Sequence, residues 1–481
     1  MALLLALWQP SGIVPSTVST AAIVQSIVAG RGGEVAQLLQ GVETLHVVAR
    51  DGSYDATIQM RGSDFRADIL LGDADYAFGQ VGGDRWRRTP SGSVRIISSD
   101  VQGDPLDHWP RSVFGLGLSS CASAGSASMS GATLNVLACR PRGNPALFYY
   151  VDPSSGHIVR EVSHEGSRVV TYDFDDFHAA GPWTQPFHWK VSGADGDSDV
   201  TVAHAVAQDV PDTAIAIPQG TPEQFALPAS GVAKIPCMFR FYISTSVRVN
   251  GQERTFTIDS GTTQTILDIG EAVRLGLHPS FGHAVVKELK VGDAVAHSLP
   301  VEAIDVFHDG IAGILGNEFF TGHVVHIDYI HHRVELISHA AFKPPTAAIA
   351  MPVDYREGLP LARASVGGSQ GDRFALDTGS QQILLSAAFV RDAHLSLQEY
   401  APTRRTEHFL EGPVAVGYVI VPPIVLGGYR LEWPYAQIEE PEDNNVEIPI
   451  DGIIGTGVLT AFDLWFDYDN GTLWMDSPYR K

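Results

Sequence analysis

The chain has 481 residues, a formal net charge of −23 at pH 7 and an isoelectric point near 5.1. This length indicates about three domains, and a hydrophobic content of 44% is enough to bury a large core. The strong negative charge argues against nucleic acid or an anionic membrane surface as a partner. A soluble acidic surface is the simpler meaning of this charge.

The N-terminal residues 1–19 begin with an apolar stretch, MALLLALW. This stretch lacks the basic residues of a complete signal peptide and is too short to span a bilayer. We interpret it as a candidate remnant of a secretion signal, and we therefore expect a periplasmic or secreted protein. No later stretch approaches the length of about 18 apolar residues that a transmembrane helix needs.

Residues 20–215 have the pattern of an antiparallel β domain that begins with a helix. Apolar residues recur at helical spacing over 20–40, and alternating strands follow, for example at 44–50 and 54–60. Asp-Gly and Asp-Pro turns separate the strands, as is typical of hairpins. The next segment, 216–233, has the turn-rich composition of a linker.

The three cysteines include no CxxC pair. Cys121 and Cys139 lie in the N-terminal domain, and the sequence leaves open whether they form a disulfide in an oxidising compartment or stay reduced. If they are bridged, Cys237 is expected to be a buried free thiol.

Two short stretches after the linker share one pattern. Residues 256–262 read FTIDSGT and residues 374–380 read FALDTGS, so an aspartate recurs in the same surroundings. Two close carboxylates cannot both ionise easily, so they share a proton. One then acts as a base toward water and the other as an acid toward a carbonyl. A single Asp-Ser/Thr-Gly is more often a strand-ending turn, but its repetition favours a catalytic pair.

A second pair of motifs shows that a larger unit is duplicated. GILGNEFFT at 313–321 matches GIIGTGVLT at 452–460 without gaps, and 325–329 matches 464–468 at the same offset of 139 residues (452 minus 313). The aspartate motifs are 118 residues apart (377 minus 259), so the second copy holds 21 more residues between its motifs.

This order of motifs resembles the two-lobed, single-chain aspartic proteases of the pepsin and retropepsin superfamily, particularly fused retropepsin-like domains of bacterial proteins. The resemblance covers a little over half of the chain. It implies a mostly β fold in which two β-barrel lobes, 234–345 and 346–481, form one pepsin-like bilobal unit. In that fold, the apolar-Gly strand of each lobe crosses behind the aspartate loop.

The resemblance also implies roles for the repeated residues. Asp259 and Asp377 would hold the lytic water. Around them, glycines would allow a tight turn, the first hydroxyl after each aspartate would bond the opposite loop, and the next hydroxyl would bond its own carboxylate. These supporting residues are Ser260, Gly261, Thr262, Thr378, Gly379 and Ser380. The apolar-Gly motifs are Ile314, Leu315, Gly316, Ile453, Ile454 and Gly455.

The flaps that cover the cleft in this family have only candidate positions in this sequence. In the first lobe the candidate is the region around 281–283, and in the second it is 404–417, with Gly412-Pro413 at its tip. Neither has a clear tyrosine of the pepsin flap type. The longer second copy implies unequal flaps or clefts, and the substrate preference stays open.

The N-terminal domain looks like the curved half-barrel of lipoprotein-carrier and lipoprotein-sorting proteins. The likeness lies in the sequences of the predicted hairpins at 80–89, 149–159 and 172–177. It implies contact with a lipid or lipoprotein through a concave face. The alternative is an accessory β domain that packs on the catalytic part.

A histidine cluster offers a rival metal site, which the duplication disfavours. His323, His326, His331 and His332 correspond to Phe462, Trp465, Asn470 and Gly471 in the second copy. A strand and hairpin turn explain the second copy, so they are expected to explain the first, and we expect no metal or other cofactor. Asp328 and Asp467 recur in the closing strand, where structural hydrogen bonds are the better explanation.

The sequence therefore predicts an aspartic endopeptidase that hydrolyses peptide bonds through two aspartates and a water molecule, without a covalent intermediate. Its partner would be a peptide or protein substrate, and the chain is expected to be a monomer. The main alternative is a non-catalytic peptide- or lipid-binding protein on a protease-like scaffold. A third reading is that each lobe pairs with another chain.

Overall fold

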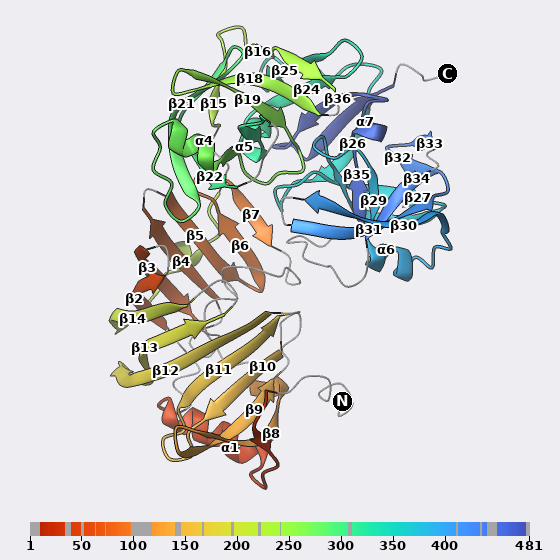
Figure 1. Ribbon diagram of the computed structural model, residues 1–481. Helices are drawn as coiled ribbons and strands as arrows, with labels where there is room; N and C mark the ends of the chain where they lie inside the picture. The colour runs from red at the N-terminus through yellow and green to blue at the C-terminus, as the bar shows by residue number, and fades with distance from the viewer. Residues whose placement is uncertain are drawn as a thin grey trace. The chain divides into compact units, whose positions relative to one another are not determined.

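The expected mostly β fold is confirmed by the computed structural model (Figure 1). The model describes residues 10–33, 40–49, 52–62, 64–72, 74–97, 118–139, 146–165, 168–193, 197–219, 223–240, 242–305, 310–409, 412–432, 435–439 and 450–477. The apolar residues 1–9 lie outside this part of the chain. Over the described residues, none of the helices has the length and hydropathy that crossing a bilayer requires.

The chain forms two compact units. The first comprises Met1–Arg87 and Ser99–Ile217, and the second comprises Arg88–Ser98 and Pro218–Lys481. The second unit therefore includes a short segment that interrupts the first unit in the sequence.

The first unit is one long antiparallel sheet with an early helix, as the sequence predicts. The sheet has the order β1-β8-β9-β10-β11-β12-β13-β14-β2-β3-β4-β5-β6. Its strands are β1 (Ile13–Val14), β2 (Gln40–Ala49), β3 (Gly52–Arg61), β4 (Asp64–Leu71), β5 (Ala74–Val81), β6 (Asp84–Arg88), β8 (Cys121–Met129), β9 (Ala132–Cys139), β10 (Ala146–Val151), β11 (Ile158–Glu165), β12 (Arg168–Ala180), β13 (Trp183–Ser192) and β14 (Ser198–Ala207). Its helical elements are α1 (Thr20–Gly30), a 3₁₀ turn (Leu118–Ser120) and α3 (Asp212–Ile215).

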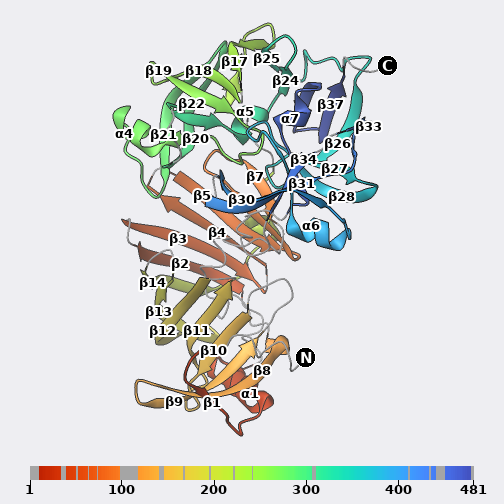
Figure 2. The same ribbon diagram turned by 45° about the vertical axis from the view of Figure 1, so that its right-hand side comes forward.

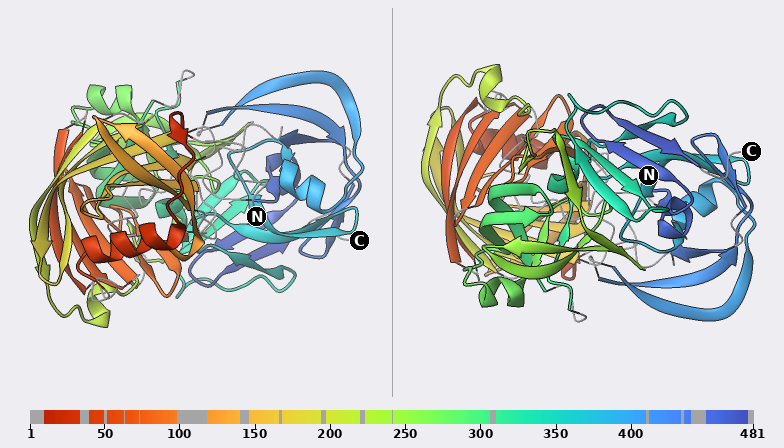
Figure 3. Two further views of the ribbon diagram at one scale, coloured as in Figure 1. Left: turned by 90° about the horizontal axis from the view of Figure 1, so that it is seen from below. Right: turned by 90° about the horizontal axis from the view of Figure 1, so that it is seen from above.

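Helix α1 covers the end of this sheet that β8 and β9 form (Figure 3). Ser19 begins the helix, because its hydroxyl accepts a hydrogen bond from the Ala22 N–H at 3.2 Å. Ile23 and Ile27, one turn apart, are buried in the core of the unit. Cys121 and Cys139 lie opposite each other on β8 and β9 and form a disulfide, which settles the choice that the sequence left open.

The second unit holds the two copies of the duplication. The first copy contains β15 (Phe225–Ala226), β16 (Val232–Ile235), β17 (Cys237–Phe239), β18 (Ile243–Val249), β19 (Gln252–Ile258), β20 (Ile266–Asp268), α4 (Ile269–Arg274), β21 (His283–Val291), β22 (Ala294–Ile304), β23 (Gly313–Leu315), α5 (Asn317–Phe320), β24 (Val324–Asp328) and β25 (Arg333–Ile337). The second contains β26 (Ile349–Asp354), β27 (Leu361–Val366), β28 (Ser369–Leu376), β29 (Ile383–Leu385), α6 (Ala387–Asp392), β30 (Gln398–Phe409), β31 (Gly412–Ile420), β32 (Ile424–Leu426), β33 (Tyr429–Leu431), β34 (Tyr435–Glu439), β35 (Gly452–Ile454), α7 (Thr456–Leu459), β36 (Asp463–Asp467) and β37 (Thr472–Asp476).

Six strands of the first copy close into a barrel, in the cyclic order β18-β19-β23-β20-β22-β21 (Figure 2). The second copy repeats the central part of this barrel as β27-β28-β35-β29-β34-β31. There, β32 pairs with β27 as β21 pairs with β18, and two hairpins, β30–β31 and β32–β33, stand where the first copy has the single hairpin β21–β22. The additional strand β30 pairs with β31 and lies in the stretch where the second copy has its 21 extra residues.

A six-stranded antiparallel sheet joins the two copies, in the order β16-β25-β24-β36-β37-β26. At its centre β24 pairs with β36, and His326 lies directly opposite Trp465. These two residues are equivalent positions of the duplication (465 minus 326 is 139), and their rings stack at 4.5 Å. The local twofold axis that relates the two copies therefore passes between these two residues.

Candidate active site

Each predicted aspartate stands at the end of a barrel strand, where the apolar-Gly strand fixes its backbone. Strand β19 runs parallel to β23, and the Asp259 N–H donates to the Leu315 carbonyl at 3.1 Å. Strand β28 runs parallel to β35, and the Asp377 N–H donates to the Ile454 carbonyl at 3.1 Å. The two loops thus leave their barrels in the same way.

Glycine is required directly after each apolar pair, because the aspartate loop passes over this position. A Cβ on Gly316 would lie 2.6 Å from the Gln264 carbonyl carbon and 2.9 Å from the Thr262 carbonyl oxygen. On Gly455 it would lie 2.5 Å from the Gln382 carbonyl oxygen. Contacts below 3 Å with backbone atoms cannot be relieved by rotating a side chain, so larger residues would displace the loops.

Four hydrogen bonds lock the two loops together across the junction of the copies. Ser260 Oγ donates to the Leu376 carbonyl at 2.7 Å, and Thr378 Oγ1 donates to the Ile258 carbonyl at 3.1 Å. The same hydroxyl oxygens accept from the opposite backbone, since Thr378 N–H reaches Ser260 Oγ and Ser260 N–H reaches Thr378 Oγ1, both at 3.0 Å. Both side chains are buried, so water does not compete for these hydrogen bonds.

The carboxylates themselves are held by their own loops. Gly261 N–H donates to Asp259 Oδ1 at 2.7 Å, and Thr262 Oγ1 donates to Asp259 Oδ2 at 2.8 Å. Gly379 N–H donates to Asp377 Oδ1 at 2.7 Å. At Ser380 the structure differs from the prediction, because its backbone N–H, at 3.0 Å, replaces the expected hydroxyl contact.

The two carboxylates meet at the junction. A Cβ placed on Gly261 would lie 2.5 to 2.6 Å from the three carboxyl atoms of Asp377, and one on Gly379 would collide in the same way with Asp259. Burial, followed by the neighbouring charge and hydrogen bond of Asp259, raises the pKa of Asp377 well above its usual value. This arrangement retains one proton between two carboxylates, as a general acid-base pair requires.

A family model described as aspartyl protease matches two segments of the chain, residues 245–319 and 362–458. The first segment contains Asp259 and Gly316, and the second contains Asp377 and Gly455. Residues 245–458 carry an aspartyl protease family domain. The resemblance drawn from the repeated motifs is thereby confirmed.

The other comparisons add little. No curated protein matches the chain. A solved structure, a DUF1329 family protein from Desulfovibrio piger, matches the N-terminal region with 11% sequence identity and a TM-score of 0.32, over 41% of this chain and 96% of that chain. This TM-score is too low to support an argument about fold or function.

Two tyrosines behind the loops of the aspartyl protease domain were not singled out by the sequence. Tyr329 and Tyr468 are equivalent positions (468 minus 329 is 139), and both are buried. Burial raises the pKa of each tyrosine hydroxyl, and the charges of the two nearby aspartates raise it further. Tyr468 Oη donates to the Ser260 carbonyl at 3.4 Å, and Tyr355 stacks on its ring at 3.9 Å. The repeated Asp-Tyr dipeptide is the signal that could have identified them.

We expect Tyr468→Phe to lower kcat/KM by about 3- to 10-fold, the loss of one modest hydrogen bond. The change removes only the bond to the Ser260 backbone, which belongs to the lock between the loops. Tyr329→Phe is a matched control, because the Tyr329 hydroxyl has no hydrogen-bond partner among the described residues. Peptide cleavage assays on both variants test this, and equal effects would contradict the role of Tyr468.

The histidine cluster of the sequence is dispersed in the structure. Within the described part of the chain, His326 is the one member of this cluster that joins a group with metal-ligand spacing, together with Asp328 and Asp463; their ligand atoms lie within 4.8 Å of one another. His326 bonds Asp463 at 2.7 Å, and Arg333 pairs with Asp328 at 2.6 Å. A guanidinium at this distance competes with a cation for the same carboxylate, so ion pairing accounts for the group.

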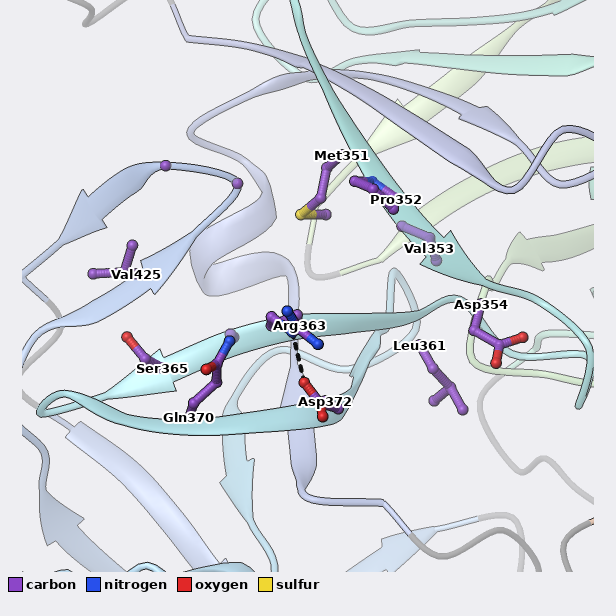
Figure 4. Close-up of a pocket in the computed structure, with 13 residues that line it drawn as sticks. Met351, Pro352, Val353, Asp354, Leu361, Arg363, Ser365, Gln370, Asp372 and Val425 are labelled. Atoms are coloured by element: carbon purple, nitrogen blue, oxygen red, sulfur yellow. Dashed lines mark hydrogen bonds and ion pairs between the residues drawn. The ribbon is translucent and has the colours of Figure 1, made fainter.

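A cavity of about 750 Å³ lies in the second copy, and neither Asp259 nor Asp377 is among the residues that line it (Figure 4). It lies between β26, β27 and the turn after β32, and an Arg363–Asp372 ion pair at 2.6 Å spans one side. The residues that line it are Met351, Pro352, Val353, Asp354, Leu361, Arg363, Ala364, Ser365, Gln370, Asp372, Val425, Gly427 and Gly428.

The two candidate flap regions differ in length. In the first copy, residues 280–283 form a tight turn in which Ser280 and His283 bond each other's backbone. In the second copy, β30 and β31 form a long hairpin whose register runs from Gln398 opposite Ile420 to Phe409 opposite Gly412. The residues at its tip, 410 and 411, lie outside the described residues.

Proposed function

We propose that this protein is an aspartic endopeptidase. The observation that carries the proposal is the pair of carboxylates from two duplicated loops, each facing the glycine of the other loop, with the pKa of Asp377 raised. Asp377 holds the proton of the pair and donates it to the carbonyl oxygen of the scissile bond. Asp259 accepts a proton from the water that attacks the carbonyl carbon.

The proposed reaction needs only groups that this chain supplies. The attack gives a neutral tetrahedral diol, because one proton enters at the carbonyl oxygen as another leaves the water. Asp259 then returns its proton to the amide nitrogen while Asp377 takes a proton from one hydroxyl of the diol. The carbon–nitrogen bond breaks, a carboxylic acid and an amine are released, and the pair again holds one proton on Asp377. The locked loops keep both carboxylates in position, which lowers the entropic cost of this sequence.

A digest of a peptide library, read by mass spectrometry, tests the proposed activity. We expect internal cleavage of peptides and inhibition by a peptide with a hydroxyl group in place of the scissile carbonyl, since that group mimics the diol. If such a ligand binds but no peptide is cleaved, the protein is a peptide-binding protein on a protease-like scaffold instead.

The pH profile gives a second, independent test. We expect kcat/KM to fall as the pH rises through the raised pKa of Asp377, because the pair then loses the proton that the carbonyl must receive. Rates of cleavage of one fluorogenic peptide between about pH 3 and pH 9, at constant ionic strength, measure this. A rate that keeps increasing toward alkaline pH would contradict the assignment of Asp377 as the acid.

The location and partners belong to the same proposal. The Cys121–Cys139 disulfide supports a periplasmic or secreted protein, because such bonds persist in oxidising compartments. We assign a peptide or protein substrate to the second unit of a monomeric chain. We assign lipid or lipoprotein contact to the first unit, on the likeness of its hairpins to carrier half-barrels.

A further inference from the structure

A short segment of the N-terminal part of the chain is built into the aspartyl protease unit. This segment, Thr89–Ile97, includes β7 (Val94–Ile97) and belongs to the second unit. Its three hydroxyl residues, Thr89, Ser91 and Ser93, are all buried. Buried hydroxyls need hydrogen-bond partners, so the partners of this segment show what it does.

The segment is a compact polar turn. Thr89 N–H donates to the Ser93 carbonyl at 2.9 Å, and the Thr89 and Ser91 hydroxyl oxygens lie 2.8 Å apart. The Gln224 side chain donates to the Ser91 carbonyl at 2.7 Å. The turn is therefore held in one conformation before its contacts with the active-site region are considered.

Its contacts in the first copy go to the two residues that directly follow the apolar-Gly motif. Ser91 Oγ donates to Glu318 Oε1 at 2.7 Å, and Ser93 Oγ bonds Asn317 Oδ1 at 3.3 Å. Glu318 is only 1% exposed, so its buried carboxylate depends on donors such as the Ser91 hydroxyl.

The same two residues hold the loop that carries Asp259. Glu318 Oε2 accepts from the Thr265 N–H at 2.6 Å, and the Asn317 N–H donates to the Thr262 carbonyl at 3.1 Å. Thr262 in turn bonds the Asp259 carboxylate. Two hydrogen bonds therefore connect Ser91 to the backbone of the catalytic loop.

The segment also reaches the second copy. Ile96 N–H donates to the Arg356 carbonyl at 2.8 Å, and a Cβ on Gly358 would lie 2.9 Å from Arg95 Cδ. The Asn317 side chain donates to the Gly358 carbonyl at 3.2 Å. This loop leads to Pro360, whose carbonyl accepts from the Leu376 N–H, directly before Asp377.

The duplication shows that this carboxylate is not needed by the lobe fold itself. The positions equivalent to Asn317 and Glu318 are Thr456 and Gly457. Thr456 bonds its own loop, donating from Oγ1 to the Ser380 carbonyl at 3.0 Å, and Gly457 offers no side chain. Glu318 therefore occurs only in the copy where the N-terminal segment docks.

We propose that Thr89–Ile97 is a positioning brace, through which the N-terminal part of the chain sets the geometry of the Asp259 loop and ties the two copies together. Its effect on cleavage rests on the proposed function, but its effect on the loop does not. Ser91, Ser93 and Glu318 are positioning residues, because they act through Thr262 and Thr265 rather than on substrate.

The test uses the full chain with Ser91→Ala, the double variant Ser91→Ala/Ser93→Ala, Glu318→Ala and Glu318→Gln. Hydrogen exchange by mass spectrometry on peptides that span 259–265 reads the loop directly. We expect exchange in this loop to be about 10-fold faster in the double variant and in Glu318→Ala. Glu318→Gln should retain slow exchange, because its amide oxygen can accept from Thr265 while its amide nitrogen donates to Ser91.

Steady-state kinetics of the same variants distinguish a positioning role from a general loss of stability. In the alanine variants we expect kcat to fall at least 10-fold while KM changes less than 2-fold, with recovery in Glu318→Gln. Ser230→Ala is the control, since its hydroxyl makes an exposed bond to the Val232 carbonyl elsewhere in the same unit. Unchanged exchange and unchanged kcat in Ser91→Ala and Glu318→Ala would overturn the brace.

The two proposals can fail separately. If the wild-type chain cleaves no peptide, the proposed function fails while the exchange experiment still decides the brace. If the double variant does not fold, the single variant Ser91→Ala, which removes one hydroxyl and keeps the loop sequence, carries the same comparison with Glu318→Gln.

Discussion

Replacement of either aspartate by asparagine is expected to lower kcat/KM by at least about 10²- to 10⁴-fold, the usual worth of one general acid or base. Asp259→Asn removes the proposed base that accepts the water proton. Asp377→Asn removes the proposed acid that protonates the carbonyl. Initial rates on the same peptide measure both, and cleavage that survives either change would refute the pair.

Stability measurements on Asp377→Asn show whether the loss of activity comes from chemistry or from unfolding. The folded-state pKa of Asp377 is raised above its unfolded value, so its stabilising contribution is present at acidic pH and is lost as the pH rises through the folded pKa. Asparagine stays neutral throughout. At neutral pH the variant should therefore unfold at a temperature no lower than the wild type.

Gly379→Ala is expected to reduce kcat/KM at least about 100-fold, because a misplacement of about 1 Å at the reacting groups has this effect. The added Cβ would meet the Asp259 carboxylate, which Gly261 and Thr262 hold in place. Such overpacking also costs about 1–3 kcal/mol of unfolding free energy. Activity assays and thermal unfolding measure the two effects.

The control for this substitution is Gly193→Ala in the first unit. A Cβ at Gly193 would have its nearest contact with the terminal Cγ2 of Val170 at 3.3 Å, which a small side-chain movement relieves. We expect wild-type cleavage from this control. Wild-type activity in Gly379→Ala would mean that the two loops do not approach each other as described.

The centre of the site could be predicted because its determinants are local and repeated. Asp259 and Asp377 stand within short motifs whose neighbours are fixed by the chain itself. The duplication added Gly316 and Gly455, since equivalent positions imply equivalent geometry. It also identified where the copies differ, in the stretch where the second copy forms the β30–β31 hairpin.

Other features depend on contacts between distant residues, which no local pattern encodes. Thr89, Ser91 and Ser93 have the composition of an exposed turn, yet they are buried by residues more than 130 positions later. Ser380 was expected to bond Asp377 through its hydroxyl, but its backbone makes the contact instead. The pairing of Cys121 with Cys139 likewise required the register of β8 and β9.

The brace has a consequence for synthesis of the chain. Ser91 and Glu318 are 227 residues apart, so at about 5–20 residues per second the partner of Ser91 is made roughly 11–45 s after it. During this interval the turn must remain solvated, which its hydroxyl and glycine residues permit. The aspartyl protease unit therefore gains its contacts with Thr89–Ile97 only after the residues that follow Gly316 have been made, so an early part of the chain folds back onto a late one.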